Sequence, residues 1–272
     1  MLPLAFAVLL ETRFASLDAG LTTAAQSSPR PRECRATANG ADGLWLRLRG
    51  SDTERYCELL ARGFARLVET PNEALSAARA AEALAGQTPA VRVLIGRASW
   101  RLHQPRLAYE QFVAAEASGA AWLADPKALH DYARAASLVG QSASALRLFR
   151  LLASRVALLD DARERTLAEI EAAAHVLADG PSGADEALGY LAQARQQPLG
   201  LLGLIDALRT LALDQSGRPD PRRGAPAWSS FAFSAFNYTD SVPLLPAAQL
   251  DTLRALQGKQ AEPAKSGRGR SR

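Results

Sequence analysis

A pattern of three packing residues recurs along the chain at the spacing of a two-helix unit. Each copy has a small residue, followed four and seven places later by two further residues suited to helix packing. The copies begin 34 and then 37 residues apart, which is typical of a helical-hairpin repeat and far longer than a coiled-coil heptad. We therefore expect an array of stacked hairpins. The copies are Ala74, Ala78 and Ala81; Ala108, Phe112 and Ala115; and Ala145, Phe149 and Leu152.

The composition favours an all-α fold. Hydrophobic residues make up 48% of the 272 residues, which is enough for a substantial core. Aromatic residues make up only 6%, and the long β-branched runs that favour strands are missing. Helix-favouring Ala, Leu, Arg and Glu are abundant instead. The sequence predicts a helical domain over residues 51–215, with turns marked by Gly and Pro.

The second copy resembles the tetratricopeptide repeat, a unit of two antiparallel helices, A and B. In that family helix A carries a large apolar residue followed by a small one, and helix B carries a small, an aromatic and a small residue. The small residues let two helices approach closely, and the aromatic ring fills the space against the next hairpin. The chain departs from the family at Ser99, where a tyrosine is usual. The matching residues are Ile95 and Gly96 in helix A, and Ala108, Phe112 and Ala115 in helix B.

The third copy continues the resemblance, and a weaker fourth unit spans about 163–197. The turns His103-Gln104 and Gly140-Gln141 stand at equivalent places before helix B. The resemblance covers about 55–215 and implies a right-handed solenoid of about four repeats, closed by a capping helix over Leu199 to Leu213. The matching residues of the third copy are Tyr132 and Ala133 in helix A, and Ala145, Phe149 and Leu152 in helix B.

The resemblance also implies a function, because helices A line the concave groove of such an array. Cations in helices A would pair with the carboxylates of an extended ligand. The expected function is a non-enzymatic scaffold or adaptor that binds a peptide or protein, although plain solvation explains each cation equally well. The candidate groove residues are Arg92, Arg97, Arg101, Lys127 and Arg134.

Two other functions stay open: a regulator that contacts nucleic acid or a membrane through a basic tail, and a helical-repeat part of a cell-wall enzyme system. Residues 217–272 hold nine Lys or Arg and four Asp or Glu, so this tail carries +5 while the whole chain carries +4. The near-neutral body argues against a nucleic-acid-binding face across the helices. We interpret 216–272 as a linker, an aromatic segment from Trp228 to Tyr238, and a disordered basic end with at most weak contact to anionic surfaces.

The N-terminal region suggests export. The apolar run Leu2 to Leu10 is too short to span a bilayer but suits a secretory signal peptide over residues 1–25. An ordinary apolar N-terminal helix is the alternative. Cys34 and Cys57 are expected to form a disulfide that ties the irregular segment 26–50 to the first helix, and two unrelated buried thiols are the alternative. We expect a periplasmic or secreted protein, with the cytoplasm as the other option.

No catalytic motif is found in the sequence. His103, His130 and His175 have no metal-ligand spacing and are assigned structural roles. We interpret two acid pairs, Glu169-Glu171 and Asp160-Asp161, as helix-surface residues that nearby arginines neutralise. In the second pair, Asp161 would pair with Arg165, four residues later. Nucleophile-elbow, Walker and dinucleotide fingerprints are missing. The expectation is no enzyme, no cofactor and no metal.

Overall fold

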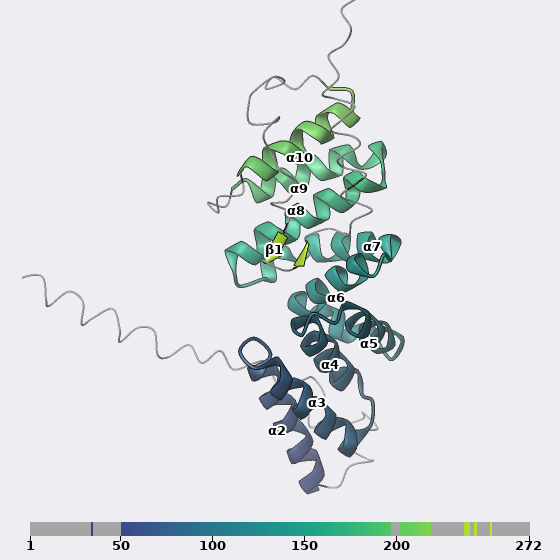
Figure 1. Ribbon diagram of the computed structural model, residues 1–272, viewed down its shortest axis with the longest axis vertical. Coiled ribbons are helices and arrows are strands. Elements are labelled where there is room, and N and C mark those ends of the chain that lie inside the picture. The colour runs from purple at the N-terminus through teal and green to yellow at the C-terminus, as the bar shows by residue number, and fades with distance from the viewer. Residues whose placement is uncertain are drawn as a thin grey trace, which may run out of the picture.

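The structure is a computed structural model that describes Cys34 and residues 50–196, 202–218, 237–239, 242–243 and 251. In these parts the chain is all-α apart from one short strand pair. The helices stack in chain order along the longest axis of the molecule (Figure 1). They are α2 (Gly50–Arg66), α3 (Pro71–Ala85), α4 (Pro89–Arg101), α5 (Pro105–Ala117), α6 (Pro126–Leu138), α7 (Ser142–Ala153), α8 (Ala162–Asp179), α9 (Ala184–Ala194) and α10 (Leu202–Gln215).

Shorter elements connect or follow these helices. The 3-10 helices η3 (Ala120–Ala124), η4 (Val156–Leu158) and η5 (Pro181–Gly183) precede α6, α8 and α9. The strands β1 (Asn237–Thr239) and β2 (Val242–Pro243) pair antiparallel. Tyr238, the last residue of the predicted aromatic segment, lies in β1, while 228–236 fall outside the described residues.

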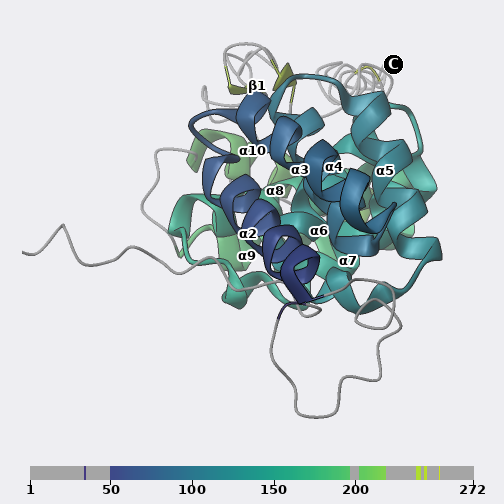
Figure 2. The same ribbon diagram turned by 90° about the horizontal axis from the view of Figure 1, so that it is seen from below.

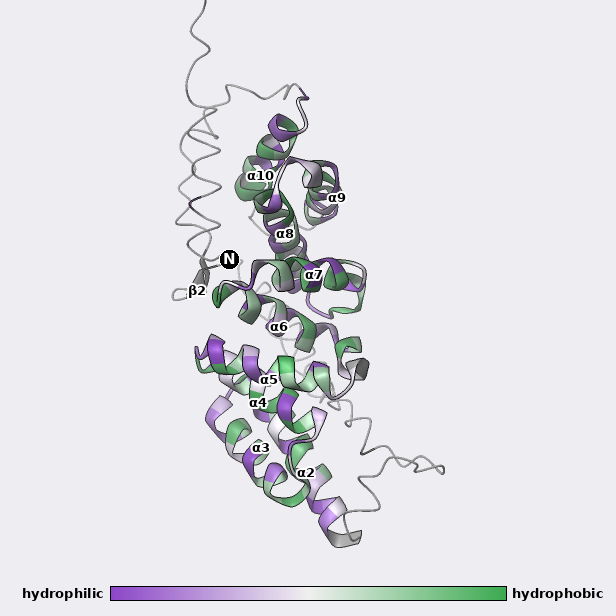
Figure 3. Ribbon diagram, turned by 90° about the vertical axis from the view of Figure 1, so that its right-hand side faces the viewer, coloured by the Kyte–Doolittle hydropathy of each residue, from purple (hydrophilic) through white to green (hydrophobic). Residues whose placement is uncertain are grey.

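Each helix packs mainly against its neighbours in sequence. The largest contacts are within the pairs α2–α3, α4–α5, α6–α7 and α8–α9, and successive pairs then pack on one another. Alternate helices also touch one another; for example, α4 contacts both α2 and α6. Seen from below, α2 and α3 overlie the later helices (Figure 2). Every helix carries both hydrophobic and hydrophilic residues (Figure 3). The buried hydrophobic residues form clusters that each draw on more than one hairpin, so the hydrophobic core is shared between hairpins.

Local sequence signals explain where the helices begin. Proline stands in the first turn of α3, α4, α5 and α6, where its missing N–H costs nothing. The hydroxyl of Thr88 accepts from the amide of Val91 at the start of α4. The carboxylate of Asp125 accepts from the amide of Lys127 at the start of α6.

The predicted equivalence of two turns is confirmed by their backbone geometry. His103 and Gly140, 37 residues apart, both adopt positive φ, 58° and 78°. The Gln104 amide donates to the Ser99 carbonyl, and the amide of Gln141 donates to the corresponding carbonyl of Ala136. The next helix starts alike in both hairpins, since the fourth residue after each glutamine donates its amide back to the carbonyl of that glutamine. The α4–α5 and α6–α7 turns therefore share one local backbone geometry.

All ten predicted packing residues are buried. The ring of Phe112 lies against Gly96, where an added Cβ would come 3.1 Å from the ring. Its centroid also lies 5.6 Å from that of Trp122 and 5.2 Å from that of Tyr132 in the next hairpin. Ser99, at the site where the family carries tyrosine, is fully buried as well. One aromatic ring thus joins α4 of its own hairpin to α6 of the following one.

The predicted disulfide is present between Cys34 and Cys57, with their Cα atoms 5.6 Å apart. Cys57 belongs to α2, and Cys34 is buried in the same core cluster as residues of the first hairpin. Closing a loop of this length contributes about 3 kcal/mol. Such a pair is compatible with an oxidising compartment. The other predictions for residues 1–25, and the remainder of 26–50, lie outside the described residues.

Truncating Phe112 is expected to weaken the contact between hairpins. Phe112→Ala leaves a cavity beside Gly96, Trp122 and Tyr132 and should lower the free energy of unfolding by about 3–5 kcal/mol. Chemical denaturation of the full chain measures the loss. Val113→Ala, one residue along and 40% exposed, is the matched control and should change stability by less than about 1 kcal/mol. Equal losses for both variants would contradict the role given to Phe112.

Candidate functional site

The five candidate groove residues lie on two alternate helices, α4 and α6. Two of them make polar contacts near helix starts. Arg92 donates through Nε to the carbonyl of Gln87 at 3.2 Å and through Nη2 to its Oε1 at 2.7 Å. Lys127 Nζ lies 2.9 Å from Oδ2 of Asp160, and its side chain is 37% exposed. The other three arginines enter ion pairs between helices.

The first of these contacts joins α4 to α6. Arg97 Nε donates to Oδ2 of Asp131 at 2.9 Å, and Arg101 Nη2 donates to Oδ1 at 3.4 Å. Asp131 is buried, so two guanidinium groups neutralise one buried carboxylate. Arg97 Nη1 also lies 3.5 Å from Oδ2 of Asp125, the N-cap of α6. We refer to these four residues as the first junction.

The second contact joins α6 to α8 in the same manner. Arg134 Nε donates to Oε1 of Glu171 at 2.8 Å. His130 Nε2 contacts the other oxygen of Glu171, and His130 Nδ1 lies 3.5 Å from Oε1 of Glu164. His130, Arg134 and Glu171 are all buried. We refer to these four residues as the second junction.

The two junctions are built on equivalent positions. Arg97 and Arg134 are 37 residues apart, the same offset as the two hairpin turns, and each donates through Nε to an acid on the next alternate helix. Helices α4, α6 and α8 are therefore linked by a continuous series of ion pairs. We call the two junctions together the ion-pair ladder.

The ladder shifts the titration of Glu171, Arg97 and Glu164 in the direction that keeps them charged. Burial would raise the pKa of Glu171, but Arg134 and His130 outweigh it and hold that pKa below its usual range. Burial likewise works against the charge of Arg97, and Asp131 and Asp125 still raise its pKa. The pKa of Glu164 shifts in the same direction as that of Glu171: burial would raise it, but His130 and Arg134 lower it.

The acid pair Glu169 and Glu171 was predicted to lie on the helix surface, and this prediction was wrong. Both residues are buried, and Glu171 completes the second junction. Burial raises the pKa of Glu169 to about 7. The interpretation of Asp161 with Arg165 was also wrong, because Asp161 instead caps α8 by accepting from the amide of Arg163 at 2.9 Å. Arg165 donates to the carbonyls of Leu159 and Asp160.

The three histidines occupy different environments. His103 is exposed in the α4–α5 turn, whereas His130 belongs to the second junction. His175 stacks on Phe149 with 4.5 Å between ring centroids, and burial lowers its pKa to about 4. Among the described residues, no cluster of three or more His, Cys, Asp or Glu has metal-binding geometry.

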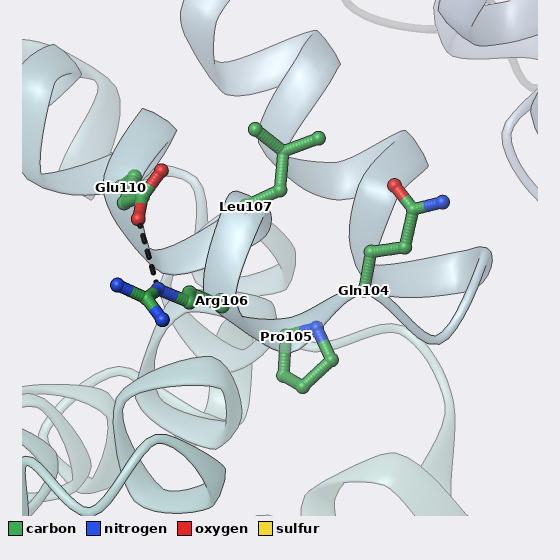
Figure 4. Close-up of a pocket in the computed structure, with 5 residues that line it drawn as sticks. All are labelled: Gln104, Pro105, Arg106, Leu107 and Glu110. Atoms are coloured by element: carbon green, nitrogen blue, oxygen red, sulfur yellow. Dashed lines mark hydrogen bonds and ion pairs between the residues drawn. The ribbon is translucent and has the colours of Figure 1, made fainter.

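A shallow hollow lies at the start of α5. Its lining side chains spread over an open surface, and Arg106 faces Glu110 with 3.3 Å between Nε and Oε1 (Figure 4). An ion pair at this exposure adds little stability, and the hollow brings together no acid, base and nucleophile. The lining residues are Gln104, Pro105, Arg106, Leu107 and Glu110.

Sequence reasoning missed the acidic half of the ladder. Asp131, Glu164 and Glu171 were not singled out as partners, although a signal existed. Arg97 and Arg134 are 37 residues apart, and each is followed by an acid, Asp131 after 34 residues and Glu171 after 37. Three of the predicted groove cations turn out to be ladder members, and Arg97 and Arg134 keep only 11% and 4% of their side-chain surface exposed. Whether the remaining exposed cations bind a ligand stays a prediction.

Comparisons with protein families, with curated proteins and with solved structures found no match to this chain. In the described parts, no helix is long and apolar enough to cross a membrane.

Removing one carboxylate of the ladder is expected to destabilise the protein. Asp131→Asn leaves Arg97 and Arg101 without their shared counter-charge and should lower the free energy of unfolding by about 3–5 kcal/mol. Glu110→Gln is the control, because it breaks an exposed pair worth less than about 1 kcal/mol. Denaturation of both variants provides the measurement, and a loss for Asp131→Asn as small as that of the control would refute a stabilising ladder.

Proposed function

We propose that the chain is a helical-repeat scaffold that binds a peptide or protein along the face formed by its alternate helices. In this proposal the four hairpins α2–α3 to α8–α9 form a right-handed solenoid of the tetratricopeptide type, and α10 caps it. The main support is the equivalence of two hairpins at a 37-residue offset, in their turns, their packing residues and their interhelical arginines.

The ladder divides the predicted groove cations into two kinds. Arg97 and Arg134 are committed to holding adjacent helices together. Arg92, Arg101 and Lys127 retain exposed surface next to the same helices. Arg101 is 29% exposed, and the Lys127–Asp160 contact is accessible to solvent. Contacts at such exposure contribute little free energy, so a carboxylate of a ligand can replace Asp160 or Gln87 with little loss of stability.

The favoured partner is an extended segment bearing carboxylates. Charge-assisted hydrogen bonds to Arg92, Arg101 and Lys127 would fix its position, and their spread over α4 and α6 suits a ligand that crosses successive helices. No chemical step is required of the chain in this role. The Cys34–Cys57 bond supports an exported protein, in the periplasm or outside the cell.

A pull-down from native cells with matched variants tests this function. The wild-type chain, Arg92→Glu/Lys127→Glu and Arg106→Glu are used as baits, and captured proteins are quantified by mass spectrometry. Reversing two charges on the proposed face should reduce capture of the partner at least about tenfold, because each lost charge-assisted contact is worth about 1.5–3 kcal/mol. Arg106→Glu reverses a charge on α5, away from that face, and should leave capture unchanged.

Helicity and unfolding midpoints of all baits are compared first, so that a misfolded variant is recognised. A partner that binds the wild-type and the double variant equally would overturn the assignment of this face. A partner lost after removal of residues 258–272 alone would instead favour action through the basic tail.

A further inference from the structure

The two arginines of the first junction hold their shared carboxylate unequally. Arg97 Nε lies 2.9 Å from Oδ2 of Asp131, and Arg97 Nη1 lies 3.5 Å from the carboxylate of Asp125. Arg101 Nη2 reaches Oδ1 of Asp131 at 3.4 Å, beyond the usual range of about 2.7–3.2 Å. The Arg97 side chain is 11% exposed, whereas that of Arg101 is 29% exposed. Arg97 is therefore the closer and the more deeply buried partner of Asp131.

Arg101 also has hydrogen-bonding capacity that the helix stack does not use. Its Nε is shielded from solvent and has no hydrogen-bond acceptor in the part of the chain that the structure describes. A guanidinium group offers several N–H donors in one plane. A buried donor without an acceptor costs free energy, and a new acceptor removes that cost. Arg101 would therefore gain from a further acceptor.

The neutralisation of Asp131 does not depend on Arg101. If the Arg101 guanidinium turns away, Asp131 keeps its ion pair with Arg97. A buried carboxylate that loses its last counter-charge is strongly destabilised, but one that loses the weaker of two is not. The Arg101 guanidinium can thus leave Asp131 for another carboxylate, and it keeps its own charge throughout.

The second junction contains a single guanidinium group, which is held firmly. Arg134 is 4% exposed and donates to Glu171 at 2.8 Å. Arg101 is the last residue of α4, and the last residue of α6, 37 positions later, is Leu138. Leu138 is partly exposed and packs on the hydrophobic core. Equivalent places on two adjacent alternate helices therefore present a cation and then an apolar side chain.

The distance between these two places sets the spacing of complementary groups on a ligand. Helices α4 and α6 contact one another in the stack (Figure 1). The axes of two helices in contact lie about 8–10 Å apart. An extended chain advances about 3.3–3.6 Å per residue. A peptide that crosses from α4 to α6 in extended form therefore advances by about three residues.

We propose that Arg101 and Leu138 recognise an extended peptide segment in which an aspartate or glutamate and an apolar residue stand about three positions apart. Arg101 leaves Asp131 and pairs with the acidic side chain, and the apolar side chain lies on Leu138. Arg97 stays in place and holds α4 to α6. This inference rests on the proposed scaffold function and adds to it the chemistry and the spacing of the ligand.

Stability measurements separate a binding role of Arg101 from a structural one. The unfolding constant of Arg101→Gln should stay within about fivefold of the wild type, because Arg97 still neutralises Asp131. Arg97→Gln should raise the constant at least about tenfold more than Arg101→Gln does, because it removes the closer counter-charge of a buried acid. Chemical denaturation of the full chain measures both. Equal losses would make Arg101 a structural residue and overturn the proposal.

Titration of the full chain with short peptides tests the ligand. The probes carry glutamate and leucine three positions apart, in both chain orders, and each is paired with a version that has glutamine in place of glutamate. The better order should bind the wild type at least about tenfold more tightly than its glutamine version. Arg101→Gln should lose this preference, and Leu138→Ala should weaken both versions alike. Arg106→Gln, which changes an 89% exposed arginine on α5, should behave as the wild type.

A glutamate preference that survives in Arg101→Gln, or its absence in the wild type, would overturn the inference. The pull-down that tests the scaffold function is repeated with Arg101→Gln as a further bait, and loss of the partner from this bait is the expected result. Capture that is lost for Arg92→Glu/Lys127→Glu but retained for Arg101→Gln would refute the role of Arg101 and leave the scaffold function standing.

Discussion

The close approach of paired helices is the constraint on which the rest of the structure depends. Alanine and glycine on the facing sides bring the backbones together, and Phe112 can then lie flat on Gly96 while reaching Trp122 and Tyr132 of the next hairpin. A larger residue at Gly96 would push the ring away from both contacts. This packing fixes how hairpins follow one another, and so it determines which polar side chains of α4, α6 and α8 meet.

The ladder shows how polar residues can add specificity to an otherwise uniform alanine-rich core. Apolar surfaces of this kind tolerate sliding, because one alanine packs much like another. A buried carboxylate does not, since it must meet its guanidinium at hydrogen-bonding distance. Asp131 and Glu171 therefore define the register between adjacent alternate helices.

The packing could be predicted from the sequence because it depends on local spacing. Ala108, Phe112 and Ala115 recur at one helical face, and the positive-φ turn at His103 was placed by its likeness to Gly140. The ladder could not be predicted as easily. An arginine inside a helix has the same pattern whether it faces water or a partner 34 residues away, and Glu169 and Glu171 looked like surface residues because arginines flank them. Only the folded arrangement shows which acid each arginine meets.

The nearest-neighbour order of the helices has a consequence for how the protein is made. Each helix makes its main contacts with a helix next to it in sequence, and even the Cys34–Cys57 bond closes a segment of only 23 residues. Contacts so local in sequence cost little chain entropy to form. Each hairpin can therefore pack onto the growing stack without waiting for the far end of the chain.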